Sequence, residues 1–306
     1  MSKILILGGT RFLGRALCEY LALNGNEVSI SSRRKMPIVL PISQYTCERF
    51  ELRISKINLS EFDYVIDFTA YNPQDLELLP SGVPNVSYIL VSTDWVSKLS
   101  AFNSNQSAHY SEPNFRYALN KSFTEKSATD KFEDKTIILR LPVALGLNDH
   151  HNRLGFYRAR ALSNQDQLLA QDDFDVSYIM LQDFILAFQQ ILSTTYQLPQ
   201  IITARSKTES YNDLVRKFNI IFKKHNSVIQ YTLMTRSEIS QNFPLFASAD
   251  PLLYENVTIA SDSNYIIGKS LLEVTEFSIE QISFTHLTTL QLQALEEERR
   301  GLNDLH

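Results

Sequence analysis

The chain has few cysteines, no long apolar run and no cluster of metal-binding residues. Its two cysteines, Cys18 and Cys47, cannot build a disulfide framework, and Cys18 falls in a helical pattern where a small core residue is suitable. No apolar stretch is long enough to cross a bilayer, so we expect no membrane partner. His150 and His151 stand without a second group of ligands, and the sequence therefore predicts no metal site.

An excess of positive charge is also missing. The chain has 29 Lys and Arg against 34 Asp and Glu, a formal net charge of -5. Nucleic-acid-binding proteins usually carry a basic face, so this balance argues against a nucleic-acid partner. The first expected strand begins at residue 3 and leaves no room for a signal peptide, so we expect a cytoplasmic protein.

The first half of the chain alternates short apolar strands with helical stretches. This alternation predicts a parallel sheet with helices on both faces, which is a doubly wound α/β fold. A link rich in Ser and Asn, residues 97–113, is expected to be a surface loop. The expected strands are 3–7, 27–31, 45–50, 63–68, 86–92 and 135–141, and the expected helices are 12–24, 73–79 and 114–130.

A glycine-rich turn joins the first strand to the first helix, with the sequence Gly8-Gly9-Thr10-Arg11-Phe12-Leu13-Gly14. The N–H groups at a helix start are unpaired and its dipole favours negative charge, so such a turn can bind an anion. Gly8 permits the tight turn, and Gly14 lets the helix lie close to the strand. The context predicts a site for the pyrophosphate of a dinucleotide, although Arg11 stands in place of the usual middle glycine and a simple turn is the alternative.

The end of the second strand carries information about the cofactor. An NAD site usually has an acidic residue there, which binds the ribose 2′-OH. Here the strand ends in Ser31-Ser32-Arg33-Arg34, and a guanidinium suits a 2′-phosphate. We therefore expect NADP(H) as the cofactor, with NAD(H) as the alternative. A basic turn on the surface is the other interpretation of these residues.

After residue 142 the alternation of strands and helices breaks down. We expect a Rossmann dinucleotide-binding domain built from 1–149 and about 175–205. A smaller, mainly C-terminal substrate-binding domain would be built from about 150–174 and 206–306. The helices expected in this half are 153–163, 183–194 and 209–224, with a charged helix at 288–300.

Tyr117 and Lys121 are four residues apart on an expected helix, so they share one face. A phenol is a weak acid–base catalyst at neutral pH, and a nearby ammonium lowers its pKa by stabilising the phenolate. The same spacing occurs at Tyr265 and Lys269, near the C-terminus. That second pair contains a glycine and follows no expected strand, so we interpret it as accidental.

The fifth strand ends with hydroxyl side chains. Ligands of open parallel sheets bind at the carboxyl ends of the strands. A hydroxyl there could hold a substrate oxygen while Tyr117 moves a proton. Ser92 and Thr93 are both candidates for this role, and both could instead simply cap the strand.

Together these motifs resemble the extended short-chain dehydrogenase/reductase superfamily, also called the NAD-dependent epimerase/dehydratase family. The glycine turn, the segment Ser92–Val96, Tyr117-x-x-x-Lys121 and Glu125 follow the family's order and spacing. Residues 139–149 look like the family's sixth strand and the loop after it, and 176–183 look like its late strand and the start of the next helix. The likeness covers most of the chain.

The resemblance implies hydride transfer at a carbinol or ketone carbon. Tyr117 would be the general acid/base, Lys121 would lower its pKa and hold the nicotinamide ribose, and Thr93 would orient the reacting oxygen. Asp94 and Trp95 would lie on the substrate side, and Asp149, Arg153, Tyr157 and Arg160 resemble a pattern that lines the substrate in one subgroup. The residues expected to bind the cofactor are Gly8, Thr10, Arg11, Phe12, Leu13, Gly14, Ser32, Arg33, Arg34, Thr69, Ala70, Tyr117 and Lys121.

Three outcomes of such chemistry remain open at this point: net reduction, epimerisation through a transient ketone, and dehydration. Dehydratases of the family follow the threonine with Asp and Glu, whereas Trp95 takes the second place here, which argues against dehydration. The expected function is an NADP(H)-dependent reductase of a keto-sugar or related carbonyl compound. Many nucleotide-sugar enzymes carry an Asn just after the sixth strand, and this chain lacks it. The sequence therefore does not determine whether the substrate carries a nucleotide.

An epimerase acting on a nucleotide sugar is the first alternative, and a dinucleotide-binding sensor or scaffold without catalysis is the second. The presence of Thr93, Tyr117 and Lys121 together argues against the non-catalytic alternative. The expected partner is a small-molecule substrate. The chain is expected to be a monomer or a homodimer, because relatives often dimerise through helices that flank the central strands and one of these, 73–79, is short here.

Overall fold

The computed structural model describes most of the first 235 residues and one later strand. The described residues are 1–35, 37, 39–53, 57–79, 86–99, 112–146, 149, 153, 157, 160, 166–193, 200–205, 207–222, 230–235 and 265–267. The chain divides into two compact units, Met1–Gly268 and Lys269–His306, and every described residue lies in the first.

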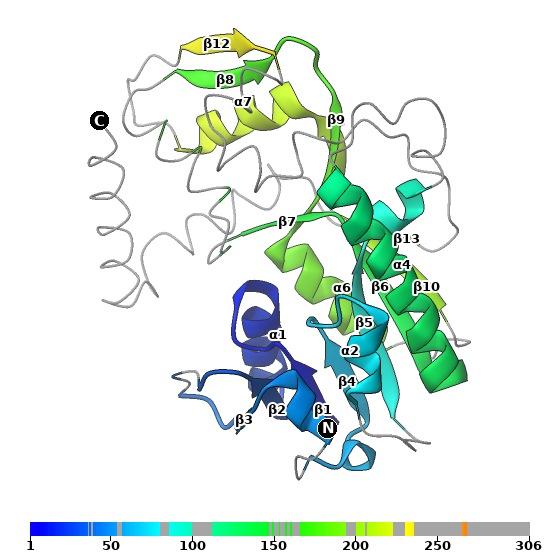
Figure 1. The fold of residues 1–306 in the computed structure, drawn as a ribbon. Coiled ribbons are helices and arrows are strands. Elements are labelled where there is room, and N and C mark those ends of the chain that lie inside the picture. The colour runs from blue at the N-terminus through cyan, green and yellow to red at the C-terminus, as the bar shows by residue number, and fades with distance from the viewer. Residues whose placement is uncertain are drawn as a thin grey trace. The chain divides into compact units, whose positions relative to one another are not determined.

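An eight-stranded sheet with strand order β13-β10-β6-β5-β4-β1-β2-β3 forms the centre of this unit (Figure 1). All of its strand pairs are parallel, with Leu5 beside Val65 and Ile89 beside Ile137 in the register. The strands are β1 Lys3–Leu7, β2 Glu27–Ser32, β3 Ser43–Thr46, β4 Tyr64–Asp67, β5 Ser87–Thr93, β6 Thr136–Leu141, β10 Gln200–Arg205 and β13 Tyr265–Ile267.

The two faces of the sheet carry separate hydrophobic cores, because successive side chains of a strand point to opposite sides. In β1, Ile4 and Ile6 pack with α1 Phe12–Leu23 and α6 Leu181–Ser193. Leu5 and Leu7 pack on the other face with α2 Pro73–Glu77 and α4 Glu112–Phe132. Helices therefore cover both faces, and the predicted doubly wound Rossmann fold is confirmed.

The first half of the prediction is wrong at one element. The run 45–50 was expected to be a strand, but β3 ends at Thr46 and a 3-10 helix covers Arg49–Arg53. The carboxylate of Glu51 accepts a hydrogen bond from the N–H of Glu48 at 2.7 Å, which stabilises the turn at this point. Arg49 is thereby directed to a buried partner, described below, instead of continuing an exposed edge strand.

The second half of the chain adds smaller elements to the central sheet. One three-stranded sheet has the order β11-β9-β7, and a two-stranded sheet pairs β12 with β8, next to which α7 lies. The edge strand β13 comes from the segment 206–306, which the sequence assigns to the smaller part, yet it pairs with β10 in the large sheet. The bounds are β7 Val143–Leu145, β8 Gln167–Ala170, β9 Asp175–Met180, β11 Lys207–Ser210, β12 Tyr231–Met234 and α7 Tyr211–Phe222.

Several expected segments fall partly or wholly outside the described residues. The expected helix 288–300 and the part of the polar link from 100 to 111 lie outside them. Of the expected helix 153–163, the described residues Arg153, Tyr157 and Arg160 are helical. None of the helices among the described residues combines the length and the apolar character needed to cross a bilayer.

Candidate active site

The glycine turn lies where the sequence predicts, between the end of β1 and the start of α1. Gly8 has a φ of 89°, which favours glycine. A Cβ on Gly14 would lie 2.5 Å from the carbonyl oxygen of Gly8, so only glycine allows this close approach of helix and strand. Within α1, all of whose residues are described, no side chain caps the N-terminus and no acidic residue lies in the first turn. The turn is therefore a fitting cradle for a phosphate group.

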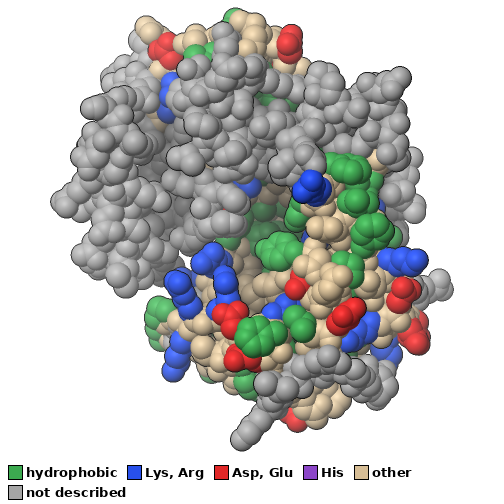
Figure 2. Space-filling view, in the orientation of Figure 1, with side chains coloured by type: hydrophobic (Ala, Val, Ile, Leu, Met, Phe, Trp, Pro, Cys, Tyr) green, Lys and Arg blue, Asp and Glu red, His purple; other side chains and the backbone are tan. Residues whose placement is uncertain are grey.

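Basic side chains lie beside this turn. Arg33 and Arg34 follow β2 and are exposed, and the Ser32 hydroxyl donates to the Arg34 carbonyl oxygen at 2.7 Å. Neither arginine forms an ion pair with any residue in the described part of the chain. Figure 2 shows Lys and Arg side chains gathered next to α1. Both guanidinium groups are thus available to an anionic ligand.

Lys121 is held at the centre of the candidate site by two backbone carbonyls. Its Nζ donates to Ala70 O and to Val91 O, both at 2.8 Å, and the residue is only 2 % exposed. The same Nζ lies 5.6 Å from the centre of the Tyr71 ring. Burial lowers the pKa of Lys121 to about 8. Nearby carboxylates act to raise this pKa, and Asp67 has the largest effect among them.

Tyr117 lies one turn before Lys121 on α4 and is 39 % exposed. Its pKa is raised above the ordinary value, first by desolvation and then by Tyr71 and the Asp94 carboxylate. The sequence predicts that Lys121 lowers this pKa, but in the structure the lysine ammonium binds carbonyl oxygens of β5 and of the turn after β4. The two side chains nonetheless share one face of α4, as their spacing predicts.

The structure distinguishes the two hydroxyl candidates at the end of β5. The Ser92 hydroxyl donates to Glu125 Oε1 at 2.5 Å, and that carboxylate also binds Arg140. The Thr93 Oγ1 accepts only a long hydrogen bond, 3.4 Å, from the N–H of Trp95 among the described contacts. Thr93 therefore keeps its hydroxyl hydrogen for another acceptor, whereas Ser92 belongs to a buried network.

Asp94 and Trp95 lie at the start of the 3-10 helix Asp94–Lys98 and are both buried. The Asp94 carboxylate contributes to the raised pKa of Tyr117, after burial and Tyr71. Trp95 packs against Ala118 of α4, with Leu99 and Phe115 at the edge of the same cluster. The Asp94 charge therefore acts on Tyr117, while Trp95 packs the strand end against α4.

The residues of the Asp-Arg-aromatic-Arg pattern have partners within the protein. Arg153 donates to Asp149 Oδ2 at 2.8 Å, and both residues are buried. Tyr157 is 1 % exposed, and its ring lies 4.9 Å from that of Phe218 on α7. Arg160 binds the backbone carbonyl of Asp166. The hydrogen bonds described for these four residues join them to one another and to later segments of the chain, and none of these bonds involves Thr93, Tyr117 or Lys121.

Three residues near the site were not singled out from the sequence: Arg49, Asp67 and Tyr71. Asp67 ends β4 and is fully buried against Arg49, and Tyr71 follows the Thr69–Ala70 turn. The phenol of Tyr71 has a raised pKa through desolvation, Asp67 and Asp75, with Arg11 and Arg33 acting in the opposite direction. An acidic residue at the end of a buried strand was the signal in the sequence that could have identified Asp67.

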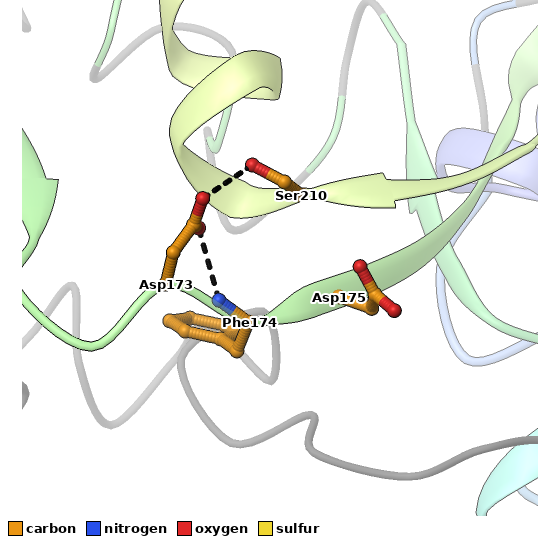
Figure 3. Close-up of a pocket in the computed structure, with 4 residues that line it drawn as sticks. All are labelled: Asp173, Phe174, Asp175 and Ser210. Atoms are coloured by element: carbon orange, nitrogen blue, oxygen red, sulfur yellow. Dashed lines mark hydrogen bonds between the residues drawn. The ribbon is translucent and has the colours of Figure 1, made fainter.

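A separate hollow lies at the start of α7 (Figure 3). It is lined by Asp173, Phe174, Asp175 and Ser210; Ser210 Oγ donates to Asp173 Oδ2 at 2.6 Å, and the backbone N–H of Phe174 donates to Asp173 Oδ1 at 2.9 Å. Asp173 also accepts from the N–H of Asn212 at 3.1 Å. These contacts cap α7, and none of the predicted site residues lines the hollow. Among the described residues no group of His, Cys, Asp and Glu is placed to hold a metal ion.

Comparison with known proteins gives matches in structure but not in sequence. No family model matches the chain, and no curated protein matches it. An epimerase from Methanothermobacter thermautotrophicus is similar, with a TM-score of 0.64, 14% identity and coverage of 97% of this chain and 94% of that chain.

Two further solved structures are similar over most of their length. The dTDP-glucose 4,6-dehydratase of Bacillus anthracis, in complex with NAD, has a TM-score of 0.60, 14% identity and coverage of 97% of this chain and 95% of that chain. The UDP-N-acetylglucosamine 4-epimerase of Bacillus cereus has a TM-score of 0.56, 18% identity and coverage of 81% and 96%. At this identity the likeness shows the fold, and the fold is the one that the family resemblance predicts.

Proposed function

We propose that this chain is an NADP(H)-dependent oxidoreductase of the extended short-chain dehydrogenase/reductase family that reduces a keto-sugar or a related carbonyl compound. The observation that carries the proposal is the convergence of separate strand ends at one place. The glycine turn follows β1, the Ala70 carbonyl that binds Lys121 follows β4, and Thr93 ends β5. Tyr117 and Lys121 face these ends from α4.

The residues present fit a dinucleotide. The close approach of Gly14 to the Gly8 carbonyl oxygen brings the start of α1 against the end of β1, and the α1 N-terminus supplies N–H donors for a phosphate. Arg33 and Arg34 stand at the end of β2, where an acidic side chain would bind an unphosphorylated ribose. Their charge supports NADP(H) over NAD(H), because a guanidinium binds a phosphate through charge-assisted hydrogen bonds.

The dinucleotide, when bound, would supply or accept a hydride at the nicotinamide ring. Tyr117 would donate a proton to the substrate oxygen in reduction, for which a protonated phenol is required, and its raised pKa keeps it protonated. The Thr93 hydroxyl would donate a hydrogen bond to the same oxygen. Lys121, whose ammonium is held by the Ala70 and Val91 carbonyl oxygens on the same face of α4, would bind the nicotinamide ribose.

An epimerase that acts on a nucleotide sugar is the second candidate, because two of the similar solved structures are described as epimerases. An epimerase needs the same acid/base tyrosine and returns the hydride to the same carbon. Dehydration is disfavoured, because Trp95 is buried against α4 at the position where a second acid would have to act.

Incubation of the purified protein with NADPH or NADH and a panel of 4-keto nucleotide sugars and simpler ketones tests the proposal. We expect stoichiometric oxidation of NADPH, followed by the absorbance of the reduced nicotinamide, and one alcohol product. Interconversion of two sugar epimers with no net change in the cofactor would establish the epimerase instead. Dinucleotide binding without turnover on any sugar of the panel would contradict both and favour a sensor or scaffold.

A further inference from the structure

Arg49 and Asp67 form a buried ion pair at the end of β4. Arg49 Nη1 and Nη2 donate to the two carboxylate oxygens of Asp67 at 3.0 and 2.7 Å. Nη1 also donates to Thr69 Oγ1 at 2.8 Å, and Nε donates to the backbone carbonyl of Asp75 at 2.9 Å. The planar guanidinium therefore connects the strand end, the turn after it and α2 in one fixed geometry.

The Asp67 carboxylate in turn fixes the backbone that follows β4. Its Oδ1 accepts from the N–H groups of Thr69 and Ala70 at 2.8 and 3.0 Å. Its Oδ2 accepts from the Tyr88 hydroxyl at 2.7 Å. The side chain of Asp67 is fully buried, and although burial raises its pKa, the charge of Arg49 and these hydrogen bonds bring the pKa below the ordinary value. The carboxylate is thus ionised and held in one orientation.

The turn fixed in this way provides one of the two carbonyl oxygens that bind Lys121. Ala70 donates its N–H to Asp67 and accepts the Lys121 ammonium on its carbonyl oxygen at 2.8 Å. An unbroken series of direct contacts therefore runs from Arg49 through Asp67 and Ala70 to Lys121.

We propose that Arg49 and Asp67 are positioning residues, which hold the Thr69–Ala70 turn and, through the Ala70 carbonyl, the Lys121 ammonium in place for the bound dinucleotide. The inference rests on the proposed function for the role of the dinucleotide. The position of Lys121 itself does not depend on that function.

The charges around Lys121 allow the arrangement to be measured directly. Desolvation lowers its pKa to about 8, Asp67, Glu125 and Asp75 act to raise it, and Arg49 acts to lower it. Removal of the Asp67 charge should therefore lower the pKa of Lys121 further. A larger fraction of the Lys121 amine would then be unprotonated at neutral pH.

The test is competitive acetylation of lysines with acetic anhydride across a pH series, with the peptide that contains Lys121 followed by mass spectrometry. Asp67→Asn is compared with the wild-type protein and with Asp213→Asn, which removes a carboxylate that pairs with Arg216 at 2.9 Å on the exposed face of α7. We expect Asp67→Asn to lower the apparent pKa of Lys121 and to weaken dinucleotide binding about tenfold, since a hydrogen bond to a charged group is lost. Asp213→Asn should change neither quantity.

Circular dichroism shows whether Asp67→Asn folds. If the folded variant has an unchanged Lys121 titration and an unchanged dinucleotide affinity, the inference is overturned. Should this variant fail to fold, Arg49→Lys decides, because a lysine cannot donate to both Asp67 oxygens, Thr69 and Asp75 together. Its Lys121 should then be acetylated severalfold faster than in the wild-type protein, and an unchanged rate would contradict the inference. A wild-type protein that binds no dinucleotide refutes the proposed function alone, because the titration of Lys121 is read without any cofactor.

Discussion

Arg140 binds both carboxylate oxygens of Glu125, through Nη2 at 2.7 Å and Nε at 3.1 Å. The pair lies between β6 and α4 and is almost fully buried. Glu125 uses its Oε1 to accept the Ser92 hydroxyl, and Arg140 Nη1 donates to Ser97 Oγ at 2.9 Å. This network fixes the end of β5 against α4 and engages the Ser92 hydroxyl, so Thr93 is the hydroxyl that we propose for the substrate oxygen.

The two hydroxyl residues should therefore respond differently to substitution. Thr93→Val should lower kcat by about tenfold to a hundredfold through loss of the bond to the substrate, and should change the melting temperature little, because the only bond described for this hydroxyl within the protein is the long one from the Trp95 N–H. Ser92→Ala should lower the free energy of unfolding by about 1–3 kcal/mol through the loss of a buried charge-assisted bond, with kcat affected less. Steady-state kinetics and urea unfolding of both variants test this, and the reverse pattern would assign the substrate contact to Ser92.

Tyr117→Phe should abolish turnover. The phenol hydroxyl is the proton donor of the proposed reduction, and loss of a general acid costs about 10²–10⁴ in rate. Dinucleotide affinity should change little, since the ring remains. Tyr265→Phe is a matched control, because Tyr265 begins the other Tyr-x-x-x-Lys match but lies on the edge strand β13 instead of a helix. Equal turnover in the wild-type protein and Tyr117→Phe would remove this mechanism.

The preference for NADPH should depend on the arginines after β2. Replacement of Arg33 and Arg34 by Ala together should weaken NADPH binding by about tenfold or more, because charge-assisted bonds to the 2′-phosphate are lost, and should leave NADH binding nearly unchanged. Arg15→Ala, which removes a partly exposed arginine of α1 that pairs with Glu19 at 2.9 Å, serves as the control. Fluorescence titrations measure the binding of NADPH and NADH by the wild-type protein, the double variant and Arg15→Ala. Equal or tighter binding of NADH by the wild-type protein would contradict the proposed cofactor.

The free energy of unfolding should depend on pH through the titration of Lys121. Its pKa is about 8 in the folded chain and 10.5 as the reference for an unburied lysine. Between these values the unfolded chain holds a proton that the folded chain has released, so stability rises with pH. Relative to Lys121→Met, the wild-type protein should gain about 2 kcal/mol in free energy of unfolding between about pH 8 and about pH 10. Urea unfolding at both pH values measures this gain. A constant difference between the two proteins would show that the lysine is not desolvated as the structure indicates.

The sequence by itself determined the fold and the geometry of the glycine turn. Apolar runs of strand length alternate with helical stretches along the chain. This alternation can be recognised from short segments, and it is typical of a parallel sheet. The glycines at 8 and 14 are likewise local, because a positive φ and a close helix–strand approach each need glycine at one position. The four-residue spacing of Tyr117 and Lys121 places both on one face of α4 whatever the rest of the chain does.

Only the tertiary structure decided how the remaining side chains are used. Arg49 and Asp67 are 18 residues apart and Ser92 and Glu125 are 33 apart, so neither partner predicts the other from local pattern. The same holds for Tyr157, whose spacing is typical of a substrate contact but whose ring is buried against Phe218. Hydrogen bonds and ion pairs between strands and helices depend on which chain segments the fold brings together. They therefore decide which hydroxyl is free, which carboxylate is structural and what holds Lys121.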